Sequence, residues 1–186
     1  LLIAGGEPRG TLYGVYGLLE DNLGCRWFTP AVGRIPKQAS LSIGAMNQRI
    51  VPTLEYREPF VADCQEGDWA ARNRMNSSAA RLEEKHGGKV TYFGFVHTFN
   101  MLLPPDQNFD QHPEYFSLVK GKRLKERTQL CCTNEDVIRI VIEAVRKNMR
   151  EHPEATVFSV SQNDWINYCE CDTCTALAKV LRAATA

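Results

Sequence analysis

The sequence lacks any excess of charge of one sign. Lys plus Arg and Asp plus Glu each total 22 in 186 residues, so the formal net charge is zero. A protein that binds a polyanion usually carries a basic face, and this balance disfavours nucleic acid as a partner. The sequence also lacks an apolar run long enough to cross a bilayer, so we expect no membrane span.

The ends of the chain lack the usual marks of a complete protein. The first residues, Leu1-Leu2-Ile3-Ala4, include no initiator Met, basic segment or cleavage site. The last residues, Ala183-Ala184-Thr185-Ala186, fall inside a predicted helix. We therefore expect a piece of a longer protein, truncated at both ends, and draw nothing from the missing signal peptide.

Cysteine, in contrast, is abundant for this length. An odd number of seven leaves at least one cysteine unpaired, bound to a metal or paired outside the chain. Three of them are close together in Cys169-x-Cys171-x-x-Cys174 and could hold a metal. A structural zinc needs four ligands, and either Cys131 or Cys132 could supply the fourth. Disulfides and unlinked thiols are the alternatives.

The hydrophobic pattern predicts two kinds of structure along the chain. Residues 1–50 favour a small α+β unit, with a helix over 10–23 that Gly24 ends, because apolar side chains recur there at helical spacing. After Val51-Pro52, strands alternate with helices, which implies parallel βαβ units. Strands are predicted at 53–60, 90–96, 128–132 and 156–161, and the clearest helix at Thr133–Glu151, with Thr133 as its N-cap.

The segment Ser161–Trp165 turns abruptly polar at the end of the last predicted strand. In parallel α/β folds, the residues just past the carboxyl ends of the strands form the active site. Asp164 could act as a general acid or base, Gln162 and Asn163 could hydrogen-bond hydroxyl groups, and Trp165 offers a face for a sugar ring. Alternatively, Asn163-Asp164 only make a turn and cap the next element.

Two further residues are candidates for binding. His97 follows the predicted strand 90–96 and would face the same edge as Asp164, although a lone histidine is more often a structural hydrogen-bonding group. Arg57, near the first predicted strand, could bind a hydroxyl or a carboxylate. The alternative for Arg57 is an ion pair with a neighbouring glutamate.

Two sets of motifs resemble known families. Pro8–Tyr16 together with Leu23–Phe28 resembles the small non-catalytic domain before the barrel in family 20 β-hexosaminidases and in α-glucuronidases. Later motifs resemble the bacterial domain-of-unknown-function family 4838, grouped with barrel glycoside hydrolases. These motifs are His97-Thr98-Phe99, His112-Pro113-Glu114-Tyr115-Phe116, Gln129-Leu130-Cys131, Ser159–Asp164 and Cys169-x-Cys171-x-x-Cys174.

The resemblance implies an α/β fold with about the first four strands of a (β/α)8 TIM barrel at 51–186, after the end of a small α+β domain at 1–50. It implies a bacterial, exported protein that acts as a glycoside hydrolase on a complex polysaccharide or glycan. A non-catalytic carbohydrate-binding protein on a barrel scaffold is the alternative. No cofactor is required for either activity, and a structural zinc is compatible with both.

In family 20 hexosaminidases, the fourth strand ends in an adjacent Asp-Glu pair. The Glu is the general acid, and the Asp orients the substrate acetamido group, whose oxygen is the internal nucleophile. Asp164 falls where that Asp would be, whereas Trp165 stands where the Glu would be. The resemblance thus implies a catalytic or substrate-orienting Asp164. We expect substrate contacts from His97, Asn163, Trp165, Arg57 and Gln162.

Overall fold

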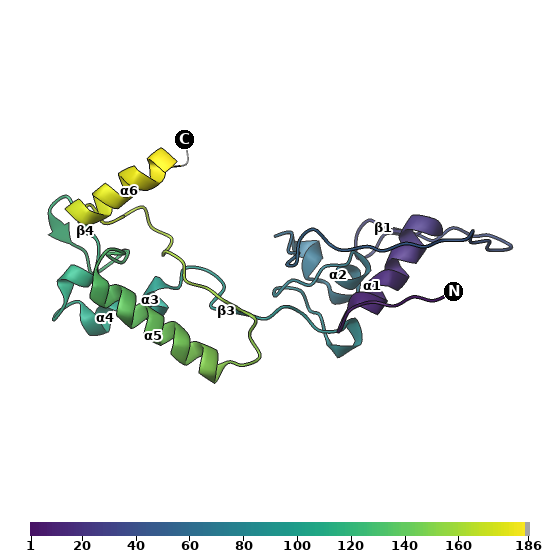
Figure 1. Ribbon diagram of the computed structural model, residues 1–186, viewed down its shortest axis with the longest axis horizontal. Coiled ribbons are helices and arrows are strands. Elements are labelled where there is room, and N and C mark those ends of the chain that lie inside the picture. Colours follow the sequence, from purple (N-terminus) through teal and green to yellow (C-terminus); the bar gives the residue numbers. More distant parts are fainter. Residues whose placement is uncertain (185–186) are drawn as a thin grey trace. The chain divides into compact units, whose positions relative to one another are not determined.

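The computed structural model describes residues 1–184 and divides the chain after Thr91. Figure 1 shows the two units, Leu1–Thr91 and Tyr92–Ala186, which are described separately below. The domain limits predicted from the sequence, 1–50 and 51–186, stay a prediction. None of the helices within the described part of the chain is long and apolar enough to cross a membrane.

Short helices and one hairpin make up the first unit. The helix predicted at 10–23 is present as α1 (Gly10–Gly17), continued by the π-helical turn η1 (Leu18–Asn22). It ends at Gly24, whose φ of +72° is the left-handed conformation expected of a C-terminal glycine. The other elements are β1 (Arg26–Trp27), antiparallel to β2 (Gly33–Arg34), η2 (Ala62–Gln65), α2 (Gly67–Arg72) and η3 (Glu84–His86).

The core of the first unit is small and centres on α2. Glu66 caps this helix, since its carboxylate accepts hydrogen bonds from the backbone N–H groups of Asp68 and Trp69. At Gly67 a Cβ atom would lie 2.0 Å from the carbonyl oxygen of Arg81, so this close approach needs glycine. Buried apolar residues here are Ala70, Ala71, Ala80 and Leu82, with Tyr16 and Met75 packed against them.

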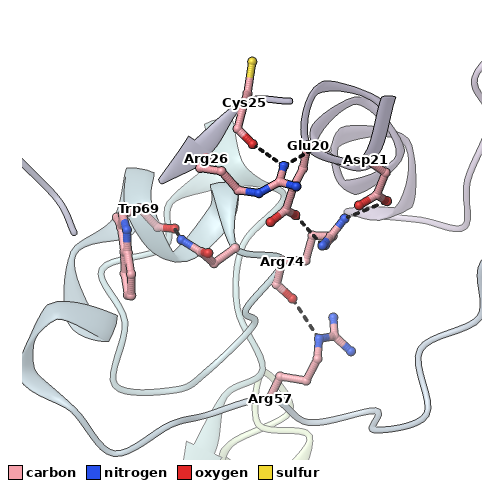
Figure 2. Close-up of polar contacts among 8 residues, drawn as sticks. Glu20, Asp21, Cys25, Arg26, Arg57, Trp69 and Arg74 are labelled. Atoms are coloured by element: carbon pink, nitrogen blue, oxygen red, sulfur yellow. Dashed lines mark hydrogen bonds and ion pairs between the residues drawn. The ribbon is translucent and has the colours of Figure 1, made fainter. Parts of the chain in front are cut away.

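Side-chain contacts, more than strand pairing, connect the loops of the first unit (Figure 2). The guanidinium of Arg74 lies 2.5 Å from the carboxylate of Glu20 and 3.8 Å from that of Asp21. The indole Nε1–H of Trp69 donates to the backbone carbonyl of Trp27 at 3.0 Å. These contacts tie α2 and the loop after it to η1 and β1.

The strand predicted at 53–60 is a loop in the structure, so that prediction was wrong. An asparagine side chain takes the place of a strand partner there. The Asn76 carboxamide accepts from the backbone N–H of Arg57 and donates to the carbonyl of Glu55, each at 2.8 Å. Side-chain hydrogen bonds of this kind connect the segment to residues 74–79 in place of a strand ladder. Residues 35–43 are likewise extended without strand pairing.

Within the part of the chain that the structure describes, the parallel strand pair lies in the second unit. Strand β3 (Tyr92–Phe93) pairs in parallel with β6 (Val157–Phe158), with Tyr92 opposite Val157 and Phe93 opposite Phe158. Helix α5 (Glu135–Glu151) lies in the connection between them. A parallel pair with a helical connection is the βαβ arrangement predicted at 90–96 and 156–161. The remaining strands of a barrel stay a prediction.

The connection from β3 to α5 is long and mostly irregular. The segment predicted as a parallel strand at 128–132 forms one antiparallel bridge, Leu130 with Phe116. Gln129 accepts a backbone hydrogen bond from Ser117, and Cys131 donates one to Tyr115, so the partner is a preceding loop. The other elements are α3 (Phe99–Leu102), α4 (Pro105–Asn108), η4 (Pro113–Tyr115), and the antiparallel pair β4 (Leu118–Val119) and β5 (Lys122–Arg123).

Helix α5 packs against α3 and covers the core of the second unit (Figure 1). Its N-cap is Asn134, whose Oδ1 accepts from the N–H groups of Asp136 and Val137. The prediction of Thr133 as the cap was wrong because the Thr133 hydroxyl instead lies beside Cys174. The core consists of Leu103, Tyr115, Phe116, Leu130 and Val137, and Phe99, Phe109, Ile140 and Val141 pack against it.

Candidate strand-end site and four-cysteine cluster

The carboxyl ends of β3 and β6 lie at the same edge, because the two strands run in parallel. Thr98, which is 2% exposed, joins the two chain segments that leave them. Its hydroxyl donates to the carbonyl of Ser159 at 3.1 Å and accepts from the N–H of Ser161 at 2.9 Å. We call His97, which follows β3, and Gln162–Trp165, which follows β6, the strand-end site.

His97 meets Gln162 across this edge. Its Nδ1 lies 3.0 Å from the carbonyl oxygen of Gln162. A carbonyl can only accept, so the hydrogen of a neutral imidazole sits on Nδ1 and Nε2 keeps a lone pair. His97 is exposed and has a φ of +58°. Its ring can therefore accept a hydrogen bond from a hydroxyl group while remaining fixed to the backbone.

Asn163 is 4% exposed and is bonded on every side-chain polar atom. Its Nδ2 donates to the carbonyl of Thr128 at 2.8 Å and to Oδ1 of Asn100 at 2.7 Å. Its Oδ1 accepts from the backbone N–H of Asn100 at 3.2 Å. Asn163 thus connects the strand-end site to Asn100 and Thr128 through buried hydrogen bonds. The prediction that it contacts a sugar stays a prediction.

Gln129 is a residue of this site that the sequence reasoning missed. Its buried carboxamide accepts from the N–H of Asn163 at 2.8 Å and donates to the carbonyl of Asn163 at 2.7 Å. It also donates to the carbonyl of Trp165 at 2.5 Å. The available signal was a large polar side chain within the apolar segment predicted as a strand at 128–132, since a buried amide must find partners.

Asp164 lies at the centre of a three-residue turn. The N–H of Trp165 donates to the carbonyl of Asn163 at 2.8 Å, which leaves the Asp164 side chain exposed. This is the turn that the sequence offered as the alternative interpretation of Asn163-Asp164. The backbone of this turn is held by the carboxamide of Gln129, and the exposed carboxylate of Asp164 is accessible to a ligand.

Aromatic and amide side chains precede and follow Asp164 in the sequence. The Trp165 ring is 43% exposed, and the Arg127 guanidinium lies over it, 5.4 Å from the ring centroid. The side-chain amide of Gln162 donates to the Tyr168 hydroxyl at 3.2 Å. The sequence pattern does not predict this contact, because Arg127 and Trp165 are far apart in the chain and meet only in the folded loops.

Arg57 belongs to the first unit, whereas the residues of the strand-end site belong to the second. Its Nε donates to the carbonyl of Arg74 at 2.7 Å, as Figure 2 shows, and its Nη1 to that of Leu54 at 2.6 Å. Its guanidinium also lies 5.7 Å from the centroid of the Tyr13 ring. The side chain is therefore engaged with the protein backbone, and its predicted contact with a substrate stays a prediction.

Four cysteines of the second unit lie close together. Three of them follow the strand-end site in the sequence, and the fourth, Cys131, precedes α5. The Sγ of Cys131 lies 3.7 Å from that of Cys171 and 3.8 Å from that of Cys174. With Cys169, the four sulfur atoms lie within 4.8 Å of one another and could hold a metal ion. These separations exceed the roughly 2.05 Å of a disulfide bond, so the four thiols are unlinked. Cys132 is exposed and outside this group, which we call the four-cysteine cluster.

The thiols of the cluster affect each other's protonation. Burial raises the pKa of Cys171, but hydrogen bonds from the Thr173 hydroxyl, the Cys174 N–H and the neighbouring thiols outweigh it, so this pKa falls to about 6. Burial, together with the bond to Cys171, raises the pKa of Cys174 to about 12. The lowered pKa of Cys171 favours its thiolate, and thiolates are the form of cysteine that binds metals.

The comparisons with known proteins give one match. No curated protein and no solved structure matches the chain. A family model, described as a domain of unknown function (DUF4838), matches residues 27–184, which include the strand-end site and the four-cysteine cluster. The chain therefore belongs to the family of this domain of unknown function, DUF4838.

Proposed function

We propose that this chain is part of a glycoside-hydrolase-like protein that binds and cleaves a complex polysaccharide or glycan at the strand-end site. One observation carries the proposal: the parallel ends of β3 and β6 bring His97 into contact with Gln162, beside the exposed Asp164 and Trp165. Aromatic rings, amides and a carboxylate at parallel strand ends are the groups that sugar recognition requires.

The scaffold in this proposal is the first part of a (β/α)8 barrel, preceded by a small α+β domain, in an exported bacterial protein. The βαβ arrangement of β3, α5 and β6 supports it. Because active sites in such barrels form at the carboxyl ends of the strands, the side chains that follow β3 and β6 are the ones that would meet the substrate.

Each strand-end residue has a distinct role in the proposal. Asp164 acts as acid or base, or orients a substrate group, because its carboxylate is exposed on a fixed turn. The Trp165 ring stacks on a sugar, and the Nε2 lone pair of His97 accepts from a hydroxyl. Hydrolysis of a glycosidic bond usually needs two carboxylates, and the partner of Asp164 would come from a later strand of the barrel.

A carbohydrate-binding protein without catalysis is the second candidate. One observation favours it: the residue after Asp164 is Trp165, whose ring lies under Arg127, and not a second acid. Such a site would bind a glycan through Trp165 and His97, and its affinity would not depend on the charge of residue 164.

The metal of the four-cysteine cluster, in the same proposal, is a structural zinc. Four thiolates fill the tetrahedral coordination of zinc and leave no open position for water or substrate. A carboxylate mechanism of glycosidic cleavage needs no metal. The zinc would therefore contribute to folding and leave the chemistry to the strand-end site.

Asp164→Asn in the full-length protein tests the activity. Turnover would be measured on soluble xylan, pectin, chitin oligosaccharides and heparin, with Asp106→Asn, an exposed carboxylate on α4, as the control. A hydrolase predicts that Asp164→Asn loses on the order of a hundredfold or more in turnover and keeps glycan binding. Equal turnover in the two variants would exclude a catalytic Asp164. Binding without hydrolysis by the unaltered protein would favour the second candidate.

A further inference from the structure

We infer that Cys131, Cys169, Cys171 and Cys174 form a complete four-thiolate zinc centre that fastens the strand-end loop, with Cys131 and not its neighbour Cys132 as the fourth ligand. The inference rests on the structural zinc proposed above and adds the ligand set and the role of the centre.

Two of the sulfur–sulfur distances match those of a tetrahedral zinc–thiolate centre. Zinc–thiolate bonds of about 2.3 Å give sulfur–sulfur edges of about 3.8 Å in a regular tetrahedron. The distances from Cys131 Sγ are 3.7 Å to Cys171 and 3.8 Å to Cys174. These two distances match the edge of such a tetrahedron, and all four sulfur atoms lie within 4.8 Å of one another.

The exposed position of Cys132 excludes it as a ligand of the zinc centre. The chain turns after Cys131, where the N–H of Asn134 donates to the carbonyl of Cys131 at 3.0 Å, and Cys132 lies within this turn. Cys131 is buried beside Cys171 and Cys174, whereas the exposed Cys132 has its Sγ 3.6 Å from the carbonyl of Leu130. One thiol of the pair belongs to the centre, and the other is a matched control next to it.

The surroundings compensate the charge of such a centre. Four thiolates and one Zn²⁺ carry a net charge of −2, which hydrogen-bond donors must stabilise. The backbone N–H of Leu118 points at the sulfur of Cys169 at 3.4 Å, and a guanidinium nitrogen of Arg123 lies 3.8 Å from it. The Thr133 hydroxyl lies 3.1 Å from the sulfur of Cys174. Soft sulfur ligands in tetrahedral geometry favour zinc over calcium or magnesium.

The centre would connect two separate segments of the second unit. Cys131 lies two residues after Gln129, which holds the backbone of Asn163 and Trp165. The other three ligands lie on the loop from Trp165 and at the start of α6 (Asp172–Ala184), which begins near β4 in Figure 1. The metal would thus join the C-terminal end of the segment that carries Asp164 to the segment that carries Gln129, and so help to position the strand-end site.

Metal counting on purified full-length protein tests this. Zinc and iron per chain are measured by mass spectrometry for the unaltered protein, Cys131→Ser and Cys132→Ser. We expect Cys132→Ser to keep all its zinc and Cys131→Ser to lose one zinc per chain. Equal zinc in the two variants, or a loss in Cys132→Ser, would overturn the ligand assignment. Iron in place of zinc, or no metal in the unaltered protein, would overturn the centre itself.

A second measurement covers the case in which Cys131→Ser fails to fold. The unaltered protein is loaded with Co²⁺ in place of zinc, and its absorption spectrum is recorded. Four thiolates predict intense sulfur-to-cobalt charge-transfer bands and the visible bands of tetrahedral cobalt. A spectrum of octahedral cobalt without charge transfer would contradict the inference. Neither result depends on glycan turnover, so a failure of the proposed glycosidase is seen separately.

Discussion

The thiol of Cys131 lies 3.7 Å from the thiol of Cys171, although forty residues separate them in the sequence. Between them run α5, β6 and the strand-end segment with Asp164. This contact therefore joins the two ends of the stretch from Cys131 to Cys171, which contains most of the strand-end site. It explains how a loop with little regular structure could keep a defined position, provided that a metal joins the sulfur atoms.

Removal of the metal should loosen the second unit locally. We expect a chelator to raise hydrogen exchange in residues 162–174, because the ligands at the start of α6 lose their link to Cys131. Exchange in α1 of the first unit serves as the internal control. An unchanged exchange pattern after complete removal of the metal would contradict the positioning role.

Asn163→Ala should destabilise the protein by about 1–3 kcal/mol, because it leaves the buried carbonyl of Thr128 and the amide of Asn100 without partners. Asn167→Ala is the matched control, since its side chain donates one exposed hydrogen bond to the carbonyl of Arg127. That loss should cost less than about 1 kcal/mol. Urea unfolding of both variants measures the difference. Equal costs would show that the bonds of Asn163 do not hold the turn.

Asp68→Asn tests an ion pair of the first unit. The Asp68 carboxylate lies 2.7 Å from Nε2 of the buried His86 and 2.9 Å from Nζ of Lys85. Hydrogen bonds from His86 and then Lys85 lower its pKa to about 2. The folded pKa is below the unfolded value of about 3.9, so this stabilisation is present above pH 4 and is lost as the pH falls towards 2.

The substitution should therefore cost most at neutral pH. Half of the Asp68 side chain is exposed, so we expect a cost of no more than about 1 kcal/mol. The difference in unfolding free energy between the two proteins should shrink between pH 4 and pH 2, as measured in urea at several pH values. Asp106→Asn is the control and should show no such trend. A difference that grows on acidification would refute the assignment.

The sequence predicted elements whose signal is local. Helix α5 was expected from its periodicity, Gly24 from the need for a left-handed cap, and the parallel strands from apolar runs that end in polar residues. The N-cap of α5 could not be predicted in this way, because Thr133 and Asn134 are both good caps. The contact of Thr133 with Cys174 decides between them.

The contacts that assemble the site could not be predicted in the same way. The choice between Cys131 and Cys132 depends on which side of the segment faces α6, and this follows from its pairing with Phe116. The network of Gln129 with Asn163 joins positions far apart in the sequence. Such pairs are set by tertiary packing, which a hydrophobic pattern does not encode.

Glycan binding at Trp165 tests the central claim most directly. The full-length protein, Trp165→Ala and Phe28→Ala are titrated by calorimetry with whichever of xylan, pectin, chitin oligosaccharides or heparin the unaltered protein binds. Phe28 is a matched control because it is an exposed aromatic residue of the first unit. Loss of the stacking ring should cost about 1–2 kcal/mol of binding free energy. This predicts an affinity roughly tenfold lower for Trp165→Ala and an unchanged affinity for Phe28→Ala. Equal affinities in the two variants, or no binding of any of these glycans, would contradict the claim.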